Sequence, residues 1–100
     1  MAKLNEPKSE LIRVHLVISG RVQGVGFRYF SQETATELGL KGWVRNGANG
    51  TVEAEVEGPK GTVEHYVERL RQGPSLSQVE RIELTERSCT GEAEGFSILF

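Results

Sequence analysis

The stretch of the chain best suited to chemistry is the glycine-rich segment 20–28, which reads Gly-Arg-Val-Gln-Gly-Val-Gly-Phe-Arg. Its glycines let the backbone turn through conformations that side chains exclude, so that N–H groups can converge on a ligand. The segment leads into a helical pattern that begins near Phe27, and the first N–H groups of a helix favour an anion. Arg28 adds a planar cation with several donors. We therefore predict an oxyanion site sized for a phosphate.

Other glycine-rich phosphate motifs fit this segment poorly. No Gly-Lys-Ser or Gly-Lys-Thr closes it, as a P-loop requires, and Tyr29 stands where a dinucleotide fingerprint needs its last glycine. Residues 24–30 faintly resemble an RNA-binding motif, but that motif belongs on an internal strand rather than on a strand-to-helix loop. A compact phosphate or phosphoryl group is the ligand that the segment favours.

The composition narrows the possible chemistry further. The chain has 100 residues, a formal net charge of −2 and a single cysteine, and all 14 acidic residues are glutamates. This length is typical of one domain, and the acidic balance argues against a nucleic-acid or membrane partner. The lack of aspartate excludes an aspartyl-phosphate intermediate and a Ser-His-Asp triad. With no signal segment and no apolar run of membrane length, we expect a cytoplasmic protein.

Alternating apolar residues predict the strands that must carry the segment. The period of two is clearest over 11–19, which commits one face of that strand to the core. The same pattern, interrupted by turn residues, predicts further strands over 42–46, 51–57, 79–86 and 96–100. On the third strand Glu53, Glu55 and Glu57 share one face, and we interpret them as a solvated stripe rather than a metal site.

Two stretches have the three-to-four-residue spacing of amphipathic helices. One begins near Phe27 and ends before Gly39, and the other begins near Thr62 and ends before Gly73. The element order βαββαβ, with one extra strand, is typical of a ferredoxin-like α+β sandwich: an antiparallel sheet of four to five strands with two helices packed on one face. The right-handed crossover rule makes the first strand central. We expect residues 11–100 to form this single domain and residues 1–10 a loose tail.

The complete string is far more specific than its glycines. Residues 19–28, followed after the first helix by Gly-Trp-Val-Arg-Asn at 42–46, closely resemble the acylphosphatase family. The resemblance continues through Gly-Thr-Val-Glu at 50–53 and Glu-Gly-Pro at 57–59 and covers residues 11–100. It implies hydrolysis of small-molecule acyl phosphates to a carboxylate and inorganic phosphate. We expect a monomeric enzyme that needs no cofactor and no metal.

The resemblance also assigns roles to two side chains and one loop. Arg28 matches the phosphate-binding arginine of the family, and Asn46 matches the asparagine that orients the attacking water. The loop that would wrap the phosphoryl oxygens comprises Val22, Gln23, Gly24, Val25, Gly26, Phe27 and Arg28.

This chemistry depends mainly on positioning. The leaving group of an acyl phosphate is a carboxylate with a pKa of about 4, so it departs as an anion without a general acid. A backbone nest with Arg28 can collect the phosphoryl charge, and the Asn46 amide can hold a water. Two other interpretations stay open: a non-catalytic module that binds an anion or carbamoyl phosphate, and an RNA-binding ferredoxin-like domain.

Overall fold

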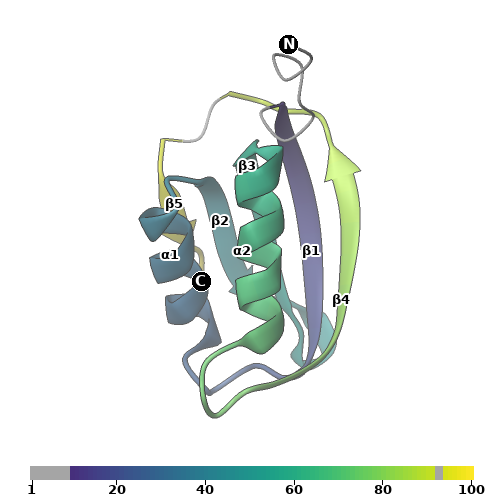
Figure 1. Ribbon diagram of the computed structural model, residues 1–100. Helices are drawn as coiled ribbons and strands as arrows, with labels where there is room; N and C mark the ends of the chain where they lie inside the picture. Colours follow the sequence, from purple (N-terminus) through teal and green to yellow (C-terminus); the bar gives the residue numbers. More distant parts are fainter. Residues whose placement is uncertain (1–9, 92–93) are drawn as a thin grey trace.

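A computed structural model gives the fold and describes residues 10–91 and 94–100 (Figure 1). The elements follow in the order β1 (Leu11–Arg21), α1 (Phe27–Glu37), β2 (Lys41–Asn46), the 3₁₀ turn η3 (Ala48–Gly50), β3 (Val52–Pro59), α2 (Lys60–Gln72), β4 (Gln78–Arg87) and β5 (Phe96–Ile98). The predicted succession of strands and helices is confirmed. The tail predicted over residues 1–10 lies outside the described residues, apart from Glu10.

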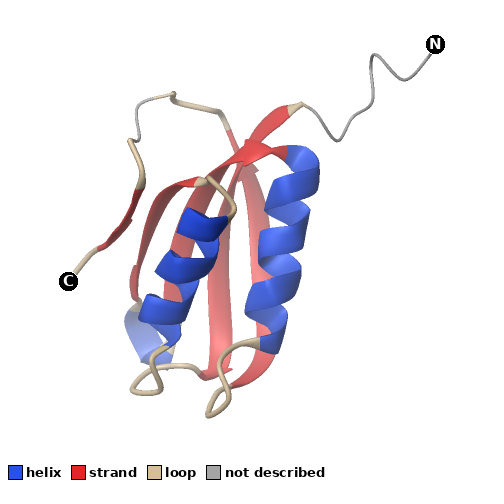
Figure 2. Cartoon of the chain, turned by 60° about the vertical axis from the view of Figure 1, so that its left-hand side comes forward, coloured by secondary structure: helices blue, strands red, loops and turns tan. Residues whose placement is uncertain are grey.

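The strands form one sheet in the order β4-β1-β3-β2-β5, and both helices lie on the same face of it (Figure 2). β3 lies between β1 and β2, as the crossover rule predicts, and β1 is an interior strand because β4 and β3 flank it. The predicted ferredoxin-like sandwich is confirmed. One detail differs, since β5 pairs in parallel with β2 and the sheet is mixed rather than wholly antiparallel. The chain reverses direction after β4, which is itself antiparallel to β1, and this reversal gives β5 the direction of β2.

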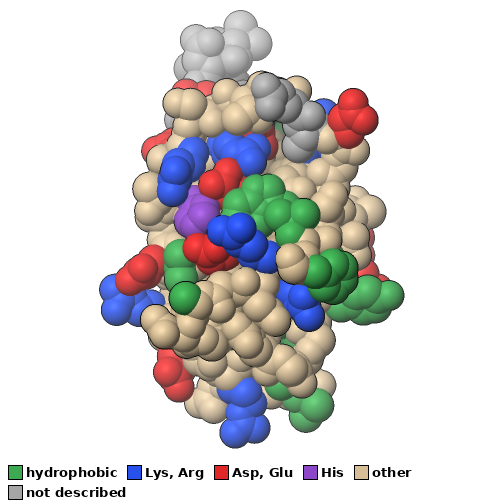
Figure 3. Space-filling model, turned by 180° about the vertical axis from the view of Figure 1, so that it is seen from behind, with side chains coloured by type: hydrophobic (Ala, Val, Ile, Leu, Met, Phe, Trp, Pro, Cys, Tyr) green, Lys and Arg blue, Asp and Glu red, His purple; other side chains and the backbone are tan. Residues whose placement is uncertain are grey.

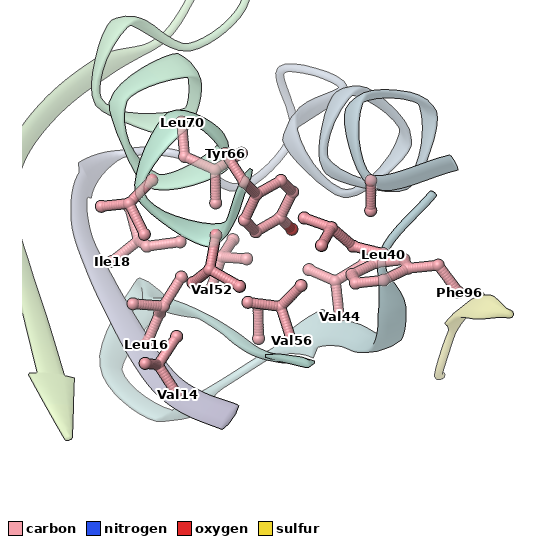
Figure 4. Packing of buried hydrophobic residues seen from close by; sticks show 14 of the residues in the cluster. Val14, Leu16, Ile18, Leu40, Val44, Val52, Val56, Tyr66, Leu70 and Phe96 are labelled. Atoms are coloured by element: carbon pink, nitrogen blue, oxygen red, sulfur yellow. The ribbon is translucent and has the colours of Figure 1, made fainter. Parts of the chain in front are cut away.

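The apolar core fills the space between the helices and the sheet (Figure 4). Strand side chains alternate between the two faces, and the face under the helices is the apolar one. In the figure the ring of Tyr66, from α2, lies in the middle of this layer. The ring is fully buried, like the inward-facing residues of β1 and β3, which are Val14, Leu16, Ile18, Val52, Ala54 and Val56.

The end of α1 determines where β2 begins and therefore where Asn46 lies. The Gly39 N–H bonds to the Thr36 carbonyl at 3.1 Å, and the Leu40 N–H bonds to the Ala35 carbonyl at 2.9 Å. These two bonds form a Schellman motif, which satisfies the last carbonyls of the helix. Leu40 is buried beside the helix end, and the predicted stop at Gly39 is confirmed.

The face of the sheet opposite the helices carries an ion network. Figure 3 views this face and shows basic and acidic side chains gathered around a histidine. Arg13 Nε lies 2.7 Å from a carboxylate oxygen of Glu55, and Arg13 Nη1 lies 2.9 Å from one of Glu57. His15 Nδ1 lies 2.8 Å from the other oxygen of Glu55. The network thus links β1 to β3 through side chains.

The predicted solvated stripe is therefore wrong for the acidic residues of β3. The side chains of Glu55 and Glu57 are only 15% and 12% exposed. In the register of β1 and β3, Arg13 lies opposite Glu57 and His15 opposite Glu55, so that the Arg13 and His15 side chains contact the carboxylates. Directly opposed charges of unlike sign stabilise a pair of strands.

Hydrogen bonds lower the pKa of both the Glu55 and the Glu57 carboxylates. Glu57 accepts backbone N–H bonds from Thr90 at 3.0 Å and Gly91 at 3.1 Å. The bond from Thr90 is the main reason that the pKa of Glu57 lies below its usual value, and Arg13 adds to it. Burial by itself raises the pKa of Glu55, but bonds with His15 and Arg13 outweigh it, and the net shift is downward.

Candidate active site

The glycine-rich segment connects β1 to α1 at the end of the sheet where β2 also ends (Figure 2). Buried Val22 and Phe27, each 1% exposed, fasten its two ends to the core. Between them Gly24 and Gly26 have φ values of +75° and +79°, a left-handed conformation that side chains disfavour. A Cβ at either glycine would meet nothing within 4 Å. Conformation therefore requires glycine here, and the space above the loop is open to a ligand.

The start of α1 leaves backbone donors without backbone acceptors in the part of the chain that the structure describes. Gly26 is the N-cap and provides no side-chain oxygen, and the first turn holds no acidic residue. The first backbone bond of the helix runs from the Phe30 N–H to the Gly26 carbonyl at 3.0 Å. Among the described residues, the N–H groups of Phe27, Arg28 and Tyr29 have no backbone acceptor. Together with the helix dipole, these donors favour an anion.

Arg28 lies in the first turn of α1 and is half-buried. Its guanidinium carbon lies 5.2 Å from the centroid of the Phe100 ring, over the ring face. This cation–π contact is attractive but supplies no counter-charge to the guanidinium. In residues 10–91 and 94–100, no carboxylate lies within ion-pair distance of Arg28. Arg28 is therefore available to bind an anion.

Asn46 is the last residue of β2 and is exposed. Its side-chain amide has no hydrogen-bond partner within the described part of the chain. Asn46 and Arg28 line the same open pocket, which has a volume of about 320 Å³. The pocket brings these two predicted residues together with Val22, Gly24, Gly26 and Phe27.

Two residues of the predicted loop lie outside this pocket. The Val25 side chain packs against the core. The Gln23 side chain turns toward the connection between β2 and β3, where it bonds to the carbonyls of Gly47 and Thr51. A phosphate contact for either residue would have to come from the backbone alone.

Sequence reasoning missed three residues of the pocket wall. These are Tyr29, which follows Arg28 on α1, and the C-terminal residues Ile98 and Phe100. Alternation did predict a strand in the C-terminal region, but it carries no signal for the neighbour with which that strand pairs. The parallel pairing of β5 with β2 brings this end of the chain to the pocket. The added wall is largely apolar and includes the ring stacked on Arg28.

The described ranges offer neither a membrane-spanning helix nor a metal-ligand cluster. None of their helices is both long enough and apolar enough to cross a membrane. They also contain no group of three or more His, Cys or Glu side chains arranged to hold a metal ion.

Comparison with known proteins identifies the family. The sequence pattern of the acylphosphatase family matches residues 14–98. The chain belongs to the acylphosphatase family. A curated acylphosphatase of Moorella thermoacetica is 45% identical over 82 residues, which span 82% of this chain and 88% of that protein. The crystal structure of acylphosphatase from Bacillus subtilis superposes with a TM-score of 0.85 at 39% identity, covering 89% of this chain and 99% of that one. The predicted family and enzyme class are confirmed.

An acylphosphatase-like fold also occurs as a small part of a larger protein. The crystal structure of full-length HypF in the phosphate- and nucleotide-bound form matches 91% of this chain with a TM-score of 0.83 and 34% identity. The match covers only 12% of HypF. Members of this fold therefore occur both alone and within longer chains.

Proposed function

We propose that the protein hydrolyses the carboxyl–phosphate bond of acyl phosphates by direct attack of water. In this proposal Arg28 and the backbone of residues 22–28 hold the phosphoryl group, and Asn46 orients the water. The observation that supports it best is the shared pocket. An arginine and an amide that have no ion-pair or hydrogen-bond partner among the described residues meet there with a helix start that lacks a side-chain cap.

The pocket offers the phosphoryl group the kind of donors that its charge requires. Backbone N–H groups at a helix start and a guanidinium fork are both strong ligands for phosphate oxygens. Buried Val22 and Phe27 anchor the loop backbone that carries the N–H groups before any ligand arrives. Preorganised donors of this kind stabilise the charge on the equatorial oxygens as the transition state forms.

The Asn46 amide suits the task of holding the nucleophile. Its carbonyl oxygen can accept a hydrogen bond from water, while its NH₂ group can donate to a phosphoryl oxygen. The water oxygen then forms a bond to phosphorus as the bond between phosphorus and the acyl oxygen breaks. The bonding electrons leave with the carboxylate, and the proton of the water passes to phosphate or solvent. The leaving carboxylate needs no general acid.

We also propose a location, an oligomeric state and a set of partners for the enzyme. We expect a cytoplasmic monomer that acts on small molecules, needs no cofactor, and has no nucleic-acid or membrane partner. The net charge of −2 supports the exclusion of polyanionic partners.

The direct test is release of inorganic phosphate from benzoyl phosphate by the purified protein. We expect turnover that persists in the presence of a metal chelator. In ¹⁸O-labelled water the label should enter the phosphate and not the benzoate, because water attacks phosphorus. Absence of phosphate release would contradict the proposal, and label in benzoate would contradict the attack at phosphorus.

A second candidate is a module that binds an anion or carbamoyl phosphate without hydrolysing an acyl phosphate. The likeness to a small part of HypF is the observation that favours it. Saturable binding of inorganic phosphate without any turnover of benzoyl or acetyl phosphate would support this second candidate. Turnover that is lost on substitution of Arg28 would exclude it.

A further inference from the structure

We infer that the side chain of Gln23 is a positioning residue, which fixes the phosphate-binding loop against the β2–β3 connection and so sets the place of Asn46 relative to Arg28. The inference rests on the proposed function and deepens it. In this inference the Gln23 side chain positions Asn46, and this role is separate from any contact between the Gln23 backbone and phosphate.

The Gln23 amide spans the gap between the two halves of the site. Its Nε2 atom donates to the Thr51 carbonyl at 2.8 Å and to the Gly47 carbonyl at 3.3 Å. A primary amide nitrogen carries two hydrogens, so it can donate to both carbonyls of the short β2–β3 connection. In residues 10–91 and 94–100, no other side-chain hydrogen bond joins the loop 22–28 to the β2–β3 connection.

The carbonyls that accept these bonds close the turn that follows Asn46. Gly47 is the next residue along the chain, and its N–H bonds to the Thr51 carbonyl at 2.8 Å. The Thr51 carbonyl thus receives both this backbone bond and the Gln23 amide. Asn46 is exposed at the end of its strand. A displacement of Gly47 therefore moves Asn46 directly, and Gln23 opposes that displacement.

The backbone on either side of Gln23 links it to the core and to the phosphate-binding residues. Val22 is 1% exposed and anchors the backbone immediately before Gln23. Gly24 and Gly26, with left-handed φ values, follow within three residues and lead into the first turn of α1, which holds Arg28. Gln23 therefore connects the group that binds phosphate to the group that holds water. In-line attack depends on their separation, since a misplacement of about 1 Å can cost a rate on the order of 100-fold.

The first test is kinetic and uses Gln23→Met, which keeps the length of the side chain and removes both donors. We expect kcat for benzoyl phosphate to fall by about 10-fold. The inhibition constant for inorganic phosphate should stay within about twofold of wild type, because Arg28 and the helix N–H groups are unchanged. An unchanged kcat, or phosphate affinity that falls as much as kcat, would overturn the inference.

Gln32→Met is the matched control. The Gln32 amide also donates to a backbone carbonyl, that of Phe96 at 3.2 Å, but this bond joins α1 to β5 and does not reach Asn46. We expect its kcat to stay near that of wild type. A decrease equal to that of Gln23→Met would show that loss of any such bond is enough, and would contradict a specific role.

A double-mutant cycle tests whether Gln23 acts through Asn46. If it does, adding Gln23→Met to Asn46→Ala should lower kcat no further than Asn46→Ala alone. Decreases that multiply would show an independent role and overturn the inference.

A measurement without substrate separates this inference from the proposed function. In ¹⁵N-labelled protein, Gln23→Met should shift the side-chain amide signals of Asn46, whereas Gln32→Met should not. If wild type hydrolyses no acyl phosphate but these shifts occur, the proposed function fails and the positional link stands. If wild type is active and Gln23→Met leaves both kcat and the Asn46 signals unchanged, the link fails alone.

Discussion

Arg13 and Arg28 lie in opposite surroundings on the same small domain. Arg13, on the open face of the sheet, is 8% exposed and binds the carboxylates of Glu55 and Glu57 at 2.7 and 2.9 Å. Arg28, at the start of α1, contacts the Phe100 ring and has no carboxylate partner among the described residues. One cation is neutralised within the fold, and the other faces an open pocket.

The difference shows how this domain separates stability from chemistry. A buried charge is costly unless it is paired and hydrogen-bonded, and the network around Arg13 meets that requirement. At the pocket, within the described residues, a guanidinium has no carboxylate partner and an amide and several backbone N–H groups have no hydrogen-bond acceptor, so a phosphoryl group can satisfy them. Substitutions at the two places should therefore change different properties of the protein.

Substitution of Arg28 should have the largest effect on activity. We expect Arg28→Ala to lower kcat/KM for benzoyl phosphate by about 1,000-fold or more, because it removes a preorganised cation from the transition state. Arg28→Lys should be little more active than Arg28→Ala, since a point charge does not reproduce the guanidinium fork. Circular dichroism should show a native fold in both. Activity within tenfold of wild type would remove Arg28 from the mechanism.

Substitution of Arg13 should give the converse result. Arg13→Met leaves Glu55 and Glu57 without their cation, and loss of one partner of a buried ion pair costs about 3 kcal/mol of unfolding free energy. Urea denaturation measures this loss. The kcat of the folded variant should match that of wild type, so a large decrease in kcat without loss of stability would break the contrast.

Substitution of Asn46 tests the division of labour inside the pocket. Asn46→Ala should lower kcat by about 100-fold, because the water is no longer aligned, while KM and inhibition by phosphate change little. Steady-state kinetics on benzoyl phosphate distinguish these parameters. A raised KM at unchanged kcat would assign Asn46 to substrate binding instead.

The ion network also predicts how stability depends on pH. The pKa of Glu57 is lower in the folded protein than its usual value of 4.5, so its carboxylate stabilises the fold above that value. This contribution is lost as the pH falls through the folded pKa. Glu57→Gln should therefore lower the free energy of unfolding by about 2 kcal/mol near pH 7. The difference in unfolding free energy between the variant and wild type should shrink below about pH 5. A difference that is constant across this range would contradict a charged role for Glu57.

Much of the architecture could be predicted from local patterns. The alternation over residues 11–19 and the stop at Gly39 correspond to the observed strand β1 and the end of α1. Each depends on the residues of one segment, and sequence reports such properties well. The motif also pointed to Arg28 and Asn46, which the fold brings to one pocket although 18 positions separate them.

Features that depend on neighbours across the sheet could not be read in the same way. Three glutamates on one strand face look solvated until the register places Arg13 and His15 opposite two of them. Phe100 and Ile98 reach the pocket only because β5 pairs with β2. The two bonds of the Gln23 side chain likewise depend on the approach of two loops, which leaves no periodic trace in the chain.

The most direct test of this account is a titration of ¹⁵N-labelled protein with inorganic phosphate. The account predicts saturable shifts concentrated in the backbone amides of residues 22–29 and in the Arg28 guanidinium, with the Arg13 guanidinium unchanged. Arg28→Ala should abolish saturation. Shifts that centre on the open face of the sheet, or their absence in a wild type that hydrolyses benzoyl phosphate, would contradict the claim that the donors of this loop hold the phosphoryl group.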